Sequence, residues 1–175
     1  MRPETKLLFL ESPTNPQLEI IDIAAVAEIA HAGGAALTVD NVFATPLLQS
    51  PLALGADCVV YSATKHIDGQ GRCLGGVILG SEEFIQKNVH NLLRQTGPAL
   101  SPFNAWVVLK GLETLDIRMR AQSERAHALA QWLEQHPAVS RVYYPGLASH
   151  PQHALSMKQM SGMGGAVLSF NVKAA

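Results

Sequence analysis

Lys65 is the residue whose setting most clearly indicates chemistry. It closes the run Tyr61-Ser62-Ala63-Thr64-Lys65, with hydroxyl side chains before it and an apolar segment leading into it. A lysine amine in such a place is suited to form a Schiff base with an aldehyde. Asp40 follows a second apolar segment, Ala36-Leu37-Thr38-Val39. Pyridoxal 5'-phosphate (PLP) needs a lysine for its aldehyde and a carboxylate for its ring nitrogen, so the two residues together indicate a PLP site.

Each of these residues also has an ordinary structural interpretation. Lys65 could be a surface lysine after a strand and Asp40 a helix cap, and loops between strands and helices are rich in both. The pair carries more weight than either residue alone. Both apolar segments have the character of buried parallel strands, whose carboxyl ends meet at one edge of the sheet. Open α/β sheets bind their ligands at that edge.

The elements that must position these residues alternate between strands and helices. Residues 7–10 form an uninterrupted apolar run, which predicts a strand covered on both faces. Asp22 is expected to cap a helix that ends at Gly33-Gly34, before the strand that leads to Asp40. This order is a βαβ unit. We expect the pattern to repeat through a helical turn over 46–54 and strands over 58–61 and 75–80.

The second half of the chain predicts helices followed by a smaller domain. Ser81 is expected to open one helix, and Ser101-Pro102 a much longer one that runs to about Gln135. We place a domain boundary inside this long helix, near Gln122. Residues 1–121 are then the cofactor-binding part of an α/β domain. Residues 122–175 begin an α+β domain whose first strands are expected over 139–144 and 166–172.

Three motifs occur in the same order as in a known family and support the interpretation as a PLP site. Glu11-Ser12-Pro13-Thr14-Asn15-Pro16, Val39-Asp40-Asn41 and Ser62-Ala63-Thr64-Lys65 resemble the Cys/Met-metabolism family of PLP enzymes, the cystathionine γ-synthase group. Within the family, residues 67–72 and 97–106 are most similar to the branch that joins O-succinylhomoserine and sulfide. One position departs from the family: the residue after the lysine is usually aromatic there and is His66 here.

The resemblance implies a fold and a set of roles. It implies PLP-dependent transferase fold type I, with Lys65 and Asp40 on the cofactor's aldehyde and ring nitrogen. Ser62 and Thr64 would bind the phosphate, although a Ser-x-Thr pair before a helix is by itself more often a cap. Asn15 would contact the ring hydroxyl, although its Pro-Thr-Asn-Pro setting alone indicates turn chemistry.

The implied reaction is γ-replacement: O-succinylhomoserine loses succinate and gains sulfide, giving homocysteine for methionine biosynthesis. Partners would be the amino-acid substrate, sulfide and further copies of the chain, as a dimer of dimers. Cystathionine γ-synthase or γ-lyase activity is the alternative within the family. Since family members are considerably longer, the chain is also interpreted as an internal fragment, inactive by itself, and a non-catalytic piece of the scaffold is the alternative of another class.

Composition argues against several other functions. Thirteen basic and fourteen acidic side chains leave a formal net charge of −1, and no basic stripe suggests nucleic acid. No signal peptide or membrane span is visible, so we expect a cytoplasmic protein with reduced Cys58 and Cys73. His150 and His153 lack a third ligand for a metal and are expected to be exposed residues at a helix start. Arg118 and Arg120 are expected to be surface charges or interface pairs.

Overall fold

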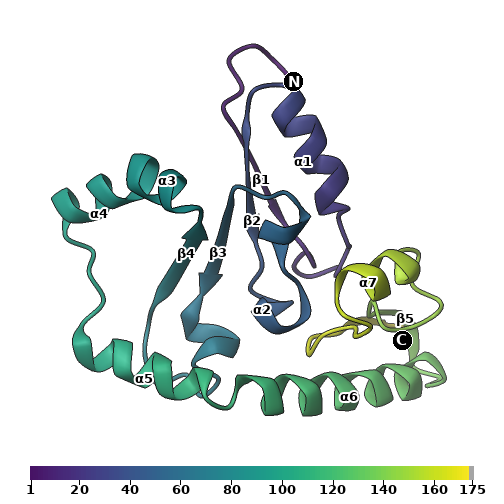
Figure 1. Cartoon of the computed structure of the whole chain (residues 1–175). Helices are drawn as coiled ribbons and strands as arrows, with labels where there is room; N and C mark the ends of the chain where they lie inside the picture. The colour runs from purple at the N-terminus through teal and green to yellow at the C-terminus, as the bar shows by residue number, and fades with distance from the viewer. Residues whose placement is uncertain (174–175) are drawn as a thin grey trace.

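A mixed four-stranded sheet forms the centre of the molecule in the computed structural model, which describes residues 1–173 (Figure 1). Its strands are β1 (Leu7–Glu11), β2 (Ala36–Asp40), β3 (Cys58–Ser62) and β4 (Gly76–Gly80), in the order β1-β2-β3-β4. The first three strands are parallel, and β4 is antiparallel to β3. The predicted strand positions and the α/β class are therefore confirmed.

The predicted βαβ unit is present, with helix α1 (Ile23–Ala32) between β1 and β2. Asp22 caps the helix as expected, because its Oδ1 accepts the N–H of Ala25 at 3.1 Å. At the other end the N–H of Gly33 bonds the last helical carbonyls. The apolar face of α1 packs on the side chains of β2 and β3 that point to the same side; this core contains Ile23, Ala27, Ala30, Leu37, Val39 and Val59.

The opposite face of the sheet is only partly covered. Leu7 and Phe9 of β1 are 52% and 62% exposed, and Ile78 of β4 is exposed as well. The expectation that the first strand is covered on both faces is therefore wrong for this chain. The physical reason is that α1 covers one face, whereas no element of residues 1–173 seals these side chains on the other.

The repeat of the βαβ pattern ends at β3. After β2 the chain forms α2 (Thr45–Leu48) and the 3₁₀ turn η1 (Pro51–Leu54), and then enters β3 in parallel, as predicted. The link from β3 to β4 holds only the π-helical turn η2 (Ala63–Ile67) and a glycine-rich loop. Without a crossover helix the chain turns back, and the expected continuation of the alternating pattern to β4 is wrong.

An arm and two helices follow the sheet. The helical segments α3 (Glu82–Ile85), η3 (Gln86–His90) and α4 (Asn91–Thr96) extend away from the sheet and contain no buried residue (Figure 1). The predicted caps are confirmed: Ser81 Oγ accepts the Phe84 N–H and Ser101 Oγ accepts the Asn104 N–H, each at 3.1 Å.

The expected single long helix is two helices, α5 (Pro102–Leu112) and α6 (Leu115–Glu134). The break lies at Thr114, whose N–H and hydroxyl both bond the carbonyl of Gly111 at 3.3 Å. Side-chain hydroxyls that bond nearby carbonyls compete with the regular helical pattern. Together α5 and α6 run along one side of the molecule, beneath the sheet in Figure 1.

The last part of the chain forms a second, two-stranded sheet. Strands β5 (Val139–Tyr143) and β6 (Ser169–Val172) are antiparallel, which confirms the two expected strands, and α7 (His153–Gln159) lies between them in sequence. Tyr144 is buried against α6, and burial raises its pKa to about 12. Helix α6 is continuous across residues 121 and 122, and the domain boundary placed there stays a prediction. No helix within residues 1–173 is long and apolar enough to cross a membrane.

Candidate active site

The carboxyl ends of the parallel strands meet at one edge of the sheet and carry most of the predicted site. In the strand register Glu11 lies beside Asp40, and Asp40 beside Val60. Ser62 ends β3 at the same edge, and Lys65 follows directly in η2. Because neighbouring strands lie about 4.8 Å apart, these residues are neighbours in space. The fold thus brings Asp40, Ser62, Thr64 and Lys65 together.

Lys65 sits on a turn whose backbone is fixed while its side chain is exposed. Its φ of −85° and ψ of −119° interrupt the helical turn. On either side the backbone is closed by hydrogen bonds: Asp68 N–H donates to Ala63 O, and Gly69 N–H donates to Lys65 O, both at 2.8 Å. The lysine amine is therefore presented from a braced loop.

The polar groups around Lys65 match the chemistry of the expected cofactor. One oxygen of Asp40 accepts the Val42 N–H at 3.0 Å, and its other oxygen has no hydrogen-bond partner among residues 1–173. The Thr64 hydroxyl makes only long contacts, 3.3 Å to Gly75 N and 3.5 Å to Gly75 O. The Ser62 side chain makes no capping hydrogen bond to the turn that follows it. An amine, a carboxylate and two hydroxyls suit an aldehyde, a pyridine nitrogen and a phosphate.

Asn15 lies at this edge too, in the loop that follows β1. Its backbone N–H donates to Glu11 Oε2 at 3.1 Å, and its side chain is exposed. The loop begins at Ser12, which is buried and whose N–H donates to the carbonyl of Asp40 at 3.3 Å. Asn15 is thus tethered to the strand that neighbours Asp40.

A buried polar network behind Asp40 was not predicted. The side-chain amide of Asn41 donates to Tyr61 Oη and to the Gln49 carbonyl, both at 2.9 Å. Gln49 in turn donates to Asn41 Oδ1 at 2.7 Å and to Ser12 O at 2.9 Å. These residues are all buried. The network fixes the backbone that follows Asp40, and a glutamine amid apolar residues gave no signal of this role.

Helix α7 joins this network from the end of the chain. Gln159 donates to Gln49 Oε1 at 2.9 Å and to Ile21 O at 3.0 Å. Gln152 bonds both backbone groups of Ile20, at 2.8 and 2.7 Å. The loop between β1 and α1 is therefore held by side chains far away in sequence.

Arg118 differs most from its predicted role. Its guanidinium donates to the carbonyls of His66 at 2.9 Å, Ile67 at 3.3 Å and Gly111 at 2.9 Å. The expectation of a surface or interface charge is wrong for Arg118, because the carbonyls of η2 have no helix to continue into and accept from it instead. Arg120, by contrast, is exposed and pairs with Asp116 at 2.9 Å.

His66 and Asp68 complete the surroundings of the lysine turn. Burial and the nearby positive charge of Arg118 lower the pKa of His66, which favours a neutral ring. Asp68 is fully buried, and the backbone N–H of Arg72, with its side chain, holds the pKa of this carboxyl below its ordinary value. Arg72 Nε lies 2.8 Å from Asp68 Oδ1. The turn after Lys65 is thus closed by a charged pair.

The two C-terminal histidines are less exposed than expected. His150 and His153 are both partly buried, His153 Nδ1 lies 3.0 Å from Pro145 O, and burial lowers the pKa of His150. The prediction that they are exposed is wrong, because the His153 ring lies against the backbone of Pro145, whereas the expected helix start is confirmed for His153, the first residue of α7. Among residues 1–173 no cluster of three His, Cys, Asp or Glu side chains could hold a metal ion.

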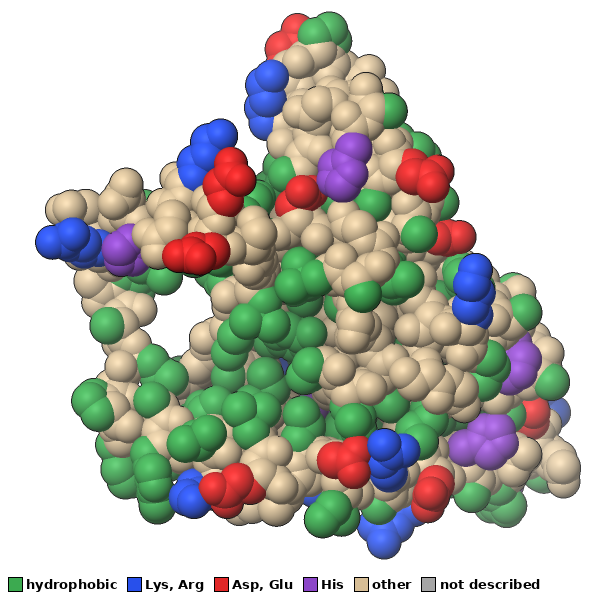
Figure 2. Space-filling view, in the orientation of Figure 1, with side chains coloured by type: hydrophobic (Ala, Val, Ile, Leu, Met, Phe, Trp, Pro, Cys, Tyr) green, Lys and Arg blue, Asp and Glu red, His purple; other side chains and the backbone are tan. Residues whose placement is uncertain are grey.

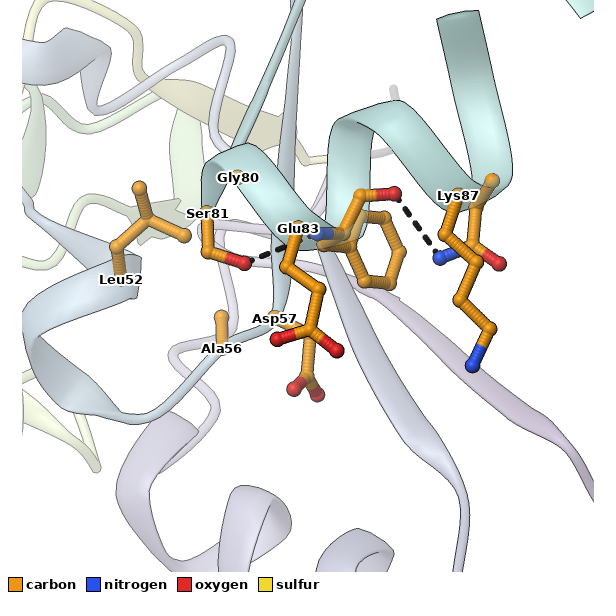
Figure 3. A pocket seen from close by; sticks show the side chains of 9 residues that line it. Leu52, Ala56, Asp57, Gly80, Ser81, Glu83 and Lys87 are labelled. Carbon is orange, nitrogen blue, oxygen red and sulfur yellow. Dashed lines mark hydrogen bonds between the residues drawn. The ribbon is translucent and has the colours of Figure 1, made fainter. Parts of the chain in front are cut away.

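A hollow of about 570 Å³ lies at the other edge of the sheet. Asp57, Gly80, Ser81, Glu83 and Lys87 are among the residues that line it (Figure 3). Asp57 precedes β3 and Gly80 ends β4, so this hollow lies a strand's length from Lys65. None of the predicted site residues contributes to it, and we do not assign it to the cofactor.

Comparison with known proteins agrees with these observations. The family model described as Cys/Met metabolism PLP-dependent enzyme matches residues 1–175. An O-succinylhomoserine sulfhydrylase from Pseudomonas aeruginosa is 63% identical over 98% of this chain and 42% of its own length. The chain thus spans about two-fifths of the length of this curated relative.

Solved structures share the fold. A methionine γ-lyase from Micromonospora echinospora matches with a TM-score of 0.95 and 40% identity, over 99% of this chain and 48% of its own. A cystathionine γ-synthase from Xanthomonas oryzae pv. oryzae, in complex with aminoacrylate and cysteine, matches with a TM-score of 0.93 and 42% identity, over 97% of this chain and 44% of its own.

Proposed function

Because the chain belongs to the Cys/Met metabolism family of PLP-dependent enzymes, we propose that the whole protein replaces the succinyl group of O-succinylhomoserine with sulfide, giving homocysteine and succinate. One observation carries the assignment of the site: a lysine, a carboxylate and two hydroxyls stand at the same edge of the parallel strands. The choice of this reaction rests on the 63% identity with the sulfhydrylase.

Lys65 is proposed as the catalytic residue. PLP, when bound, supplies an electron sink that makes the Cα proton of an amino acid acidic. The exposed amine of Lys65 would hold the cofactor aldehyde covalently until the substrate amine takes its place. The released amine would then accept the Cα proton and later move protons at Cβ. The fixed backbone of η2 would keep this amine within reach of both carbons.

Asp40 is proposed to hold a proton on the ring nitrogen. At a separation of about 4 Å and an effective dielectric of about 20, a carboxylate attracts that proton by about 4 kcal/mol, or roughly three pKa units. The backbone N–H of Val42 fixes one carboxylate oxygen, which leaves the other for the ring. Such an attraction keeps a pyridine nitrogen protonated at neutral pH.

The remaining residues are proposed to orient the cofactor. The hydroxyls of Ser62 and Thr64 would donate to its phosphate, and the long contacts of Thr64 to Gly75 leave that hydroxyl free to turn. Asn15 would contact the ring hydroxyl. In this arrangement the end of β2 would hold the ring nitrogen, whereas the end of β3 and the turn η2 would hold both the phosphate and the aldehyde.

The architecture of the whole protein belongs to the same proposal. Residues 1–121 would be the C-terminal part of a fold type I cofactor domain, and residues 122–175 the start of the smaller domain. We also propose a cytoplasmic homo-oligomer, a dimer of dimers, in line with the family. The exposed apolar side chains of α5, among them Phe103 and Trp106, are consistent with such an assembly.

The second candidate is cystathionine γ-synthase or γ-lyase activity. The likeness to the cystathionine γ-synthase structure supports it, because this fold serves more than one sulfur nucleophile. A piece of scaffold without activity of its own is the candidate of another class, supported by the short span of the chain relative to its relatives.

The test uses the whole protein with PLP. Borohydride reduction and peptide mapping should label Lys65, and Lys65→Ala should abolish both the label and turnover. Lys110→Ala, a change at an exposed lysine on α5, is the matched control and should alter neither. Assays with sulfide, with cysteine and without a nucleophile then separate the candidate reactions. A label on another lysine would refute the assignment.

A further inference from the structure

We propose that Arg118 is a positioning residue for Lys65: its guanidinium holds the carbonyl end of the turn that carries the lysine. This inference rests on the proposed function of Lys65. It goes beyond that proposal because Arg118 lies on α6, well away in sequence, and touches the turn only through the backbone.

The contacts concentrate on the residues directly after the lysine. Arg118 Nη1 donates to His66 O at 2.9 Å, and Nη2 donates to Ile67 O at 3.3 Å. Nη2 also donates to Gly111 O at 2.9 Å, and Nε donates to Thr114 Oγ1 at 3.0 Å. One planar group thus connects η2, the end of α5 and the start of α6. A guanidinium can do this because its N–H groups form a rigid fork.

Gly69 shows how closely the guanidinium covers the turn. A Cβ atom built on Gly69 would lie 2.2 Å from Arg118 Nη1 and 2.4 Å from Cζ. The φ of Gly69 is +73°, a left-handed conformation that glycine adopts readily. Glycine is therefore required at position 69 for two reasons: it adopts the left-handed backbone conformation, and its lack of a Cβ atom leaves room for the Arg118 guanidinium.

The electrostatic setting favours this role. Helical carbonyls at the end of a turn carry partial negative charge and are stabilised by a cation. Burial and the positive charge of Arg72 lower the pKa of Arg118, and the buried Asp68 carboxylate acts in the opposite direction by attracting the guanidinium. Arg118 is partly buried, so water competes less for its N–H groups than at the surface.

Without Arg118, the carbonyls of His66 and Ile67 lose their donor, and the turn can move relative to α5. A displacement of about 1 Å at a reacting group reduces rates on the order of 100-fold. Lys65 must reach the cofactor aldehyde and later the substrate carbons, so its turn is where such a displacement would act. The backbone bonds that close the turn, from Asp68 and Gly69, would open more often.

The experiment uses the whole protein with Arg118→Ala, Arg118→Lys and the control Arg120→Ala. Arg120 lies on the same helix but is exposed, and its guanidinium pairs with Asp116. The first readout needs no cofactor: amide hydrogen exchange at Asp68 and Gly69 should be on the order of 10-fold faster in Arg118→Ala, with α1 unchanged. Equal acceleration throughout the protein would overturn the inference, since Arg118 would then serve only global stability.

The second readout is the rate at which added PLP becomes covalently attached to Lys65, followed by absorbance and borohydride trapping. We expect a decrease of 10-fold to 100-fold in Arg118→Ala, and partial recovery with guanidinium chloride far below denaturing concentrations. If Arg118→Ala does not fold, Arg118→Lys decides: it keeps the charge, lacks the fork and should still attach PLP more slowly. Wild-type exchange and attachment in the folded Arg118 variants would overturn the inference.

The two readouts separate this inference from the proposed function. If the wild-type protein attached no PLP at Lys65, the proposed site would be wrong, and the exchange measurement alone would still report whether Arg118 holds the turn. If PLP attaches to Lys65 at the same rate in the wild type and in every Arg118 variant, the proposed site is supported and the positioning role of Arg118 is refuted.

Discussion

Gly111 offers a sharp test of the idea that the lysine turn is held by close backbone packing. Helix α5 passes directly over the end of η2 at this residue. A Cβ atom at Gly111 would lie 2.3 Å from Ile67 O and 2.8 Å from both Cα and O of Asp68. These are backbone atoms, so no side-chain rotation can relieve the contacts. Gly111→Ala must move the turn away from the helix.

The size of the effect follows from two opposing contributions. Ordinary contacts of a Cβ atom begin at about 3.4 Å, so relief from 2.3 Å requires a shift of about 1 Å. Overpacking of this kind destabilises by about 1–3 kcal/mol, while alanine in place of glycine within a helix stabilises by about 0.5–1 kcal/mol. The net loss in the free energy of unfolding should be about 1 kcal/mol, a factor of about 5 in the folding equilibrium.

Turnover should respond more strongly than stability. The shift of about 1 Å falls on the turn that carries Lys65 and should lower kcat on the order of 100-fold. Denaturant unfolding and turnover are measured on the same preparations of the whole protein. Lys110→Ala, at the neighbouring position, removes only an exposed pair with Glu113 and should change stability by less than about 0.5 kcal/mol. A Gly111→Ala protein with wild-type stability and turnover would refute this account of the packing.

Two further predictions concern carboxylates. Asp40→Ala should leave the covalent attachment of PLP to Lys65 intact but lower turnover by up to roughly 1,000-fold, the equivalent of about 4 kcal/mol; near-normal turnover would reduce Asp40 to a turn residue. The lowered pKa of Asp68 means that its contribution to stability is present above the pKa of the unfolded state and is lost as pH falls through the folded value, below about pH 4. Asp68→Asn should cost about 1–3 kcal/mol at pH 7 and lose less stability than wild type between pH 7 and pH 3 in urea unfolding; parallel losses in the two proteins would contradict this origin.

The features that could be predicted from the sequence are those that depend on residues close together in the chain. The caps at Asp22, Ser81 and Ser101 follow from local hydrogen bonding, and the apolar segments before Asp40 and Ser62 follow from burial between layers. These features need no knowledge of distant residues. Because β2 and β3 are parallel, their carboxyl ends lie at the same edge of the sheet, and the predicted site residues that follow them lie there too.

What the sequence did not predict depends on contacts between distant segments. Nothing near Arg118 in the sequence indicates that its partners are the carbonyls after Lys65, because backbone acceptors have no residue type to recognise. The glutamines at the two ends of α7 gave no signal for the same reason, since Gln152, just before the helix, and Gln159, its last residue, bond mainly to backbone groups. The direction of β4 depended on a short link whose path could not be inferred from composition.

The uncovered face of the sheet bears directly on the proposed chemistry. Side chains alternate along a strand, so Asp40 points to the same face as Thr38, which pairs with the exposed Phe9. Ser62 emerges on this face as well, two residues after Val60, the partner of Asp40. Leu37 and Val39 point to the opposite side, beneath α1. The predicted site therefore opens on the face of the sheet that carries solvent-exposed apolar side chains.

Apolar side chains also gather around α5 and the neighbouring part of the sheet (Figure 2); Leu100, Phe103, Trp106 and Leu109 are exposed there. Bare apolar surface of this extent is typical of regions that other polypeptide covers. Such cover would decide how strongly Asp40 acts, because it sets the local dielectric. With water on this face, the attraction between Asp40 and a ring proton at about 4 Å is only about 1 kcal/mol, less than one pKa unit. With water excluded it reaches the roughly three units that would keep the ring protonated, so the proposed role of Asp40 requires that this face be covered.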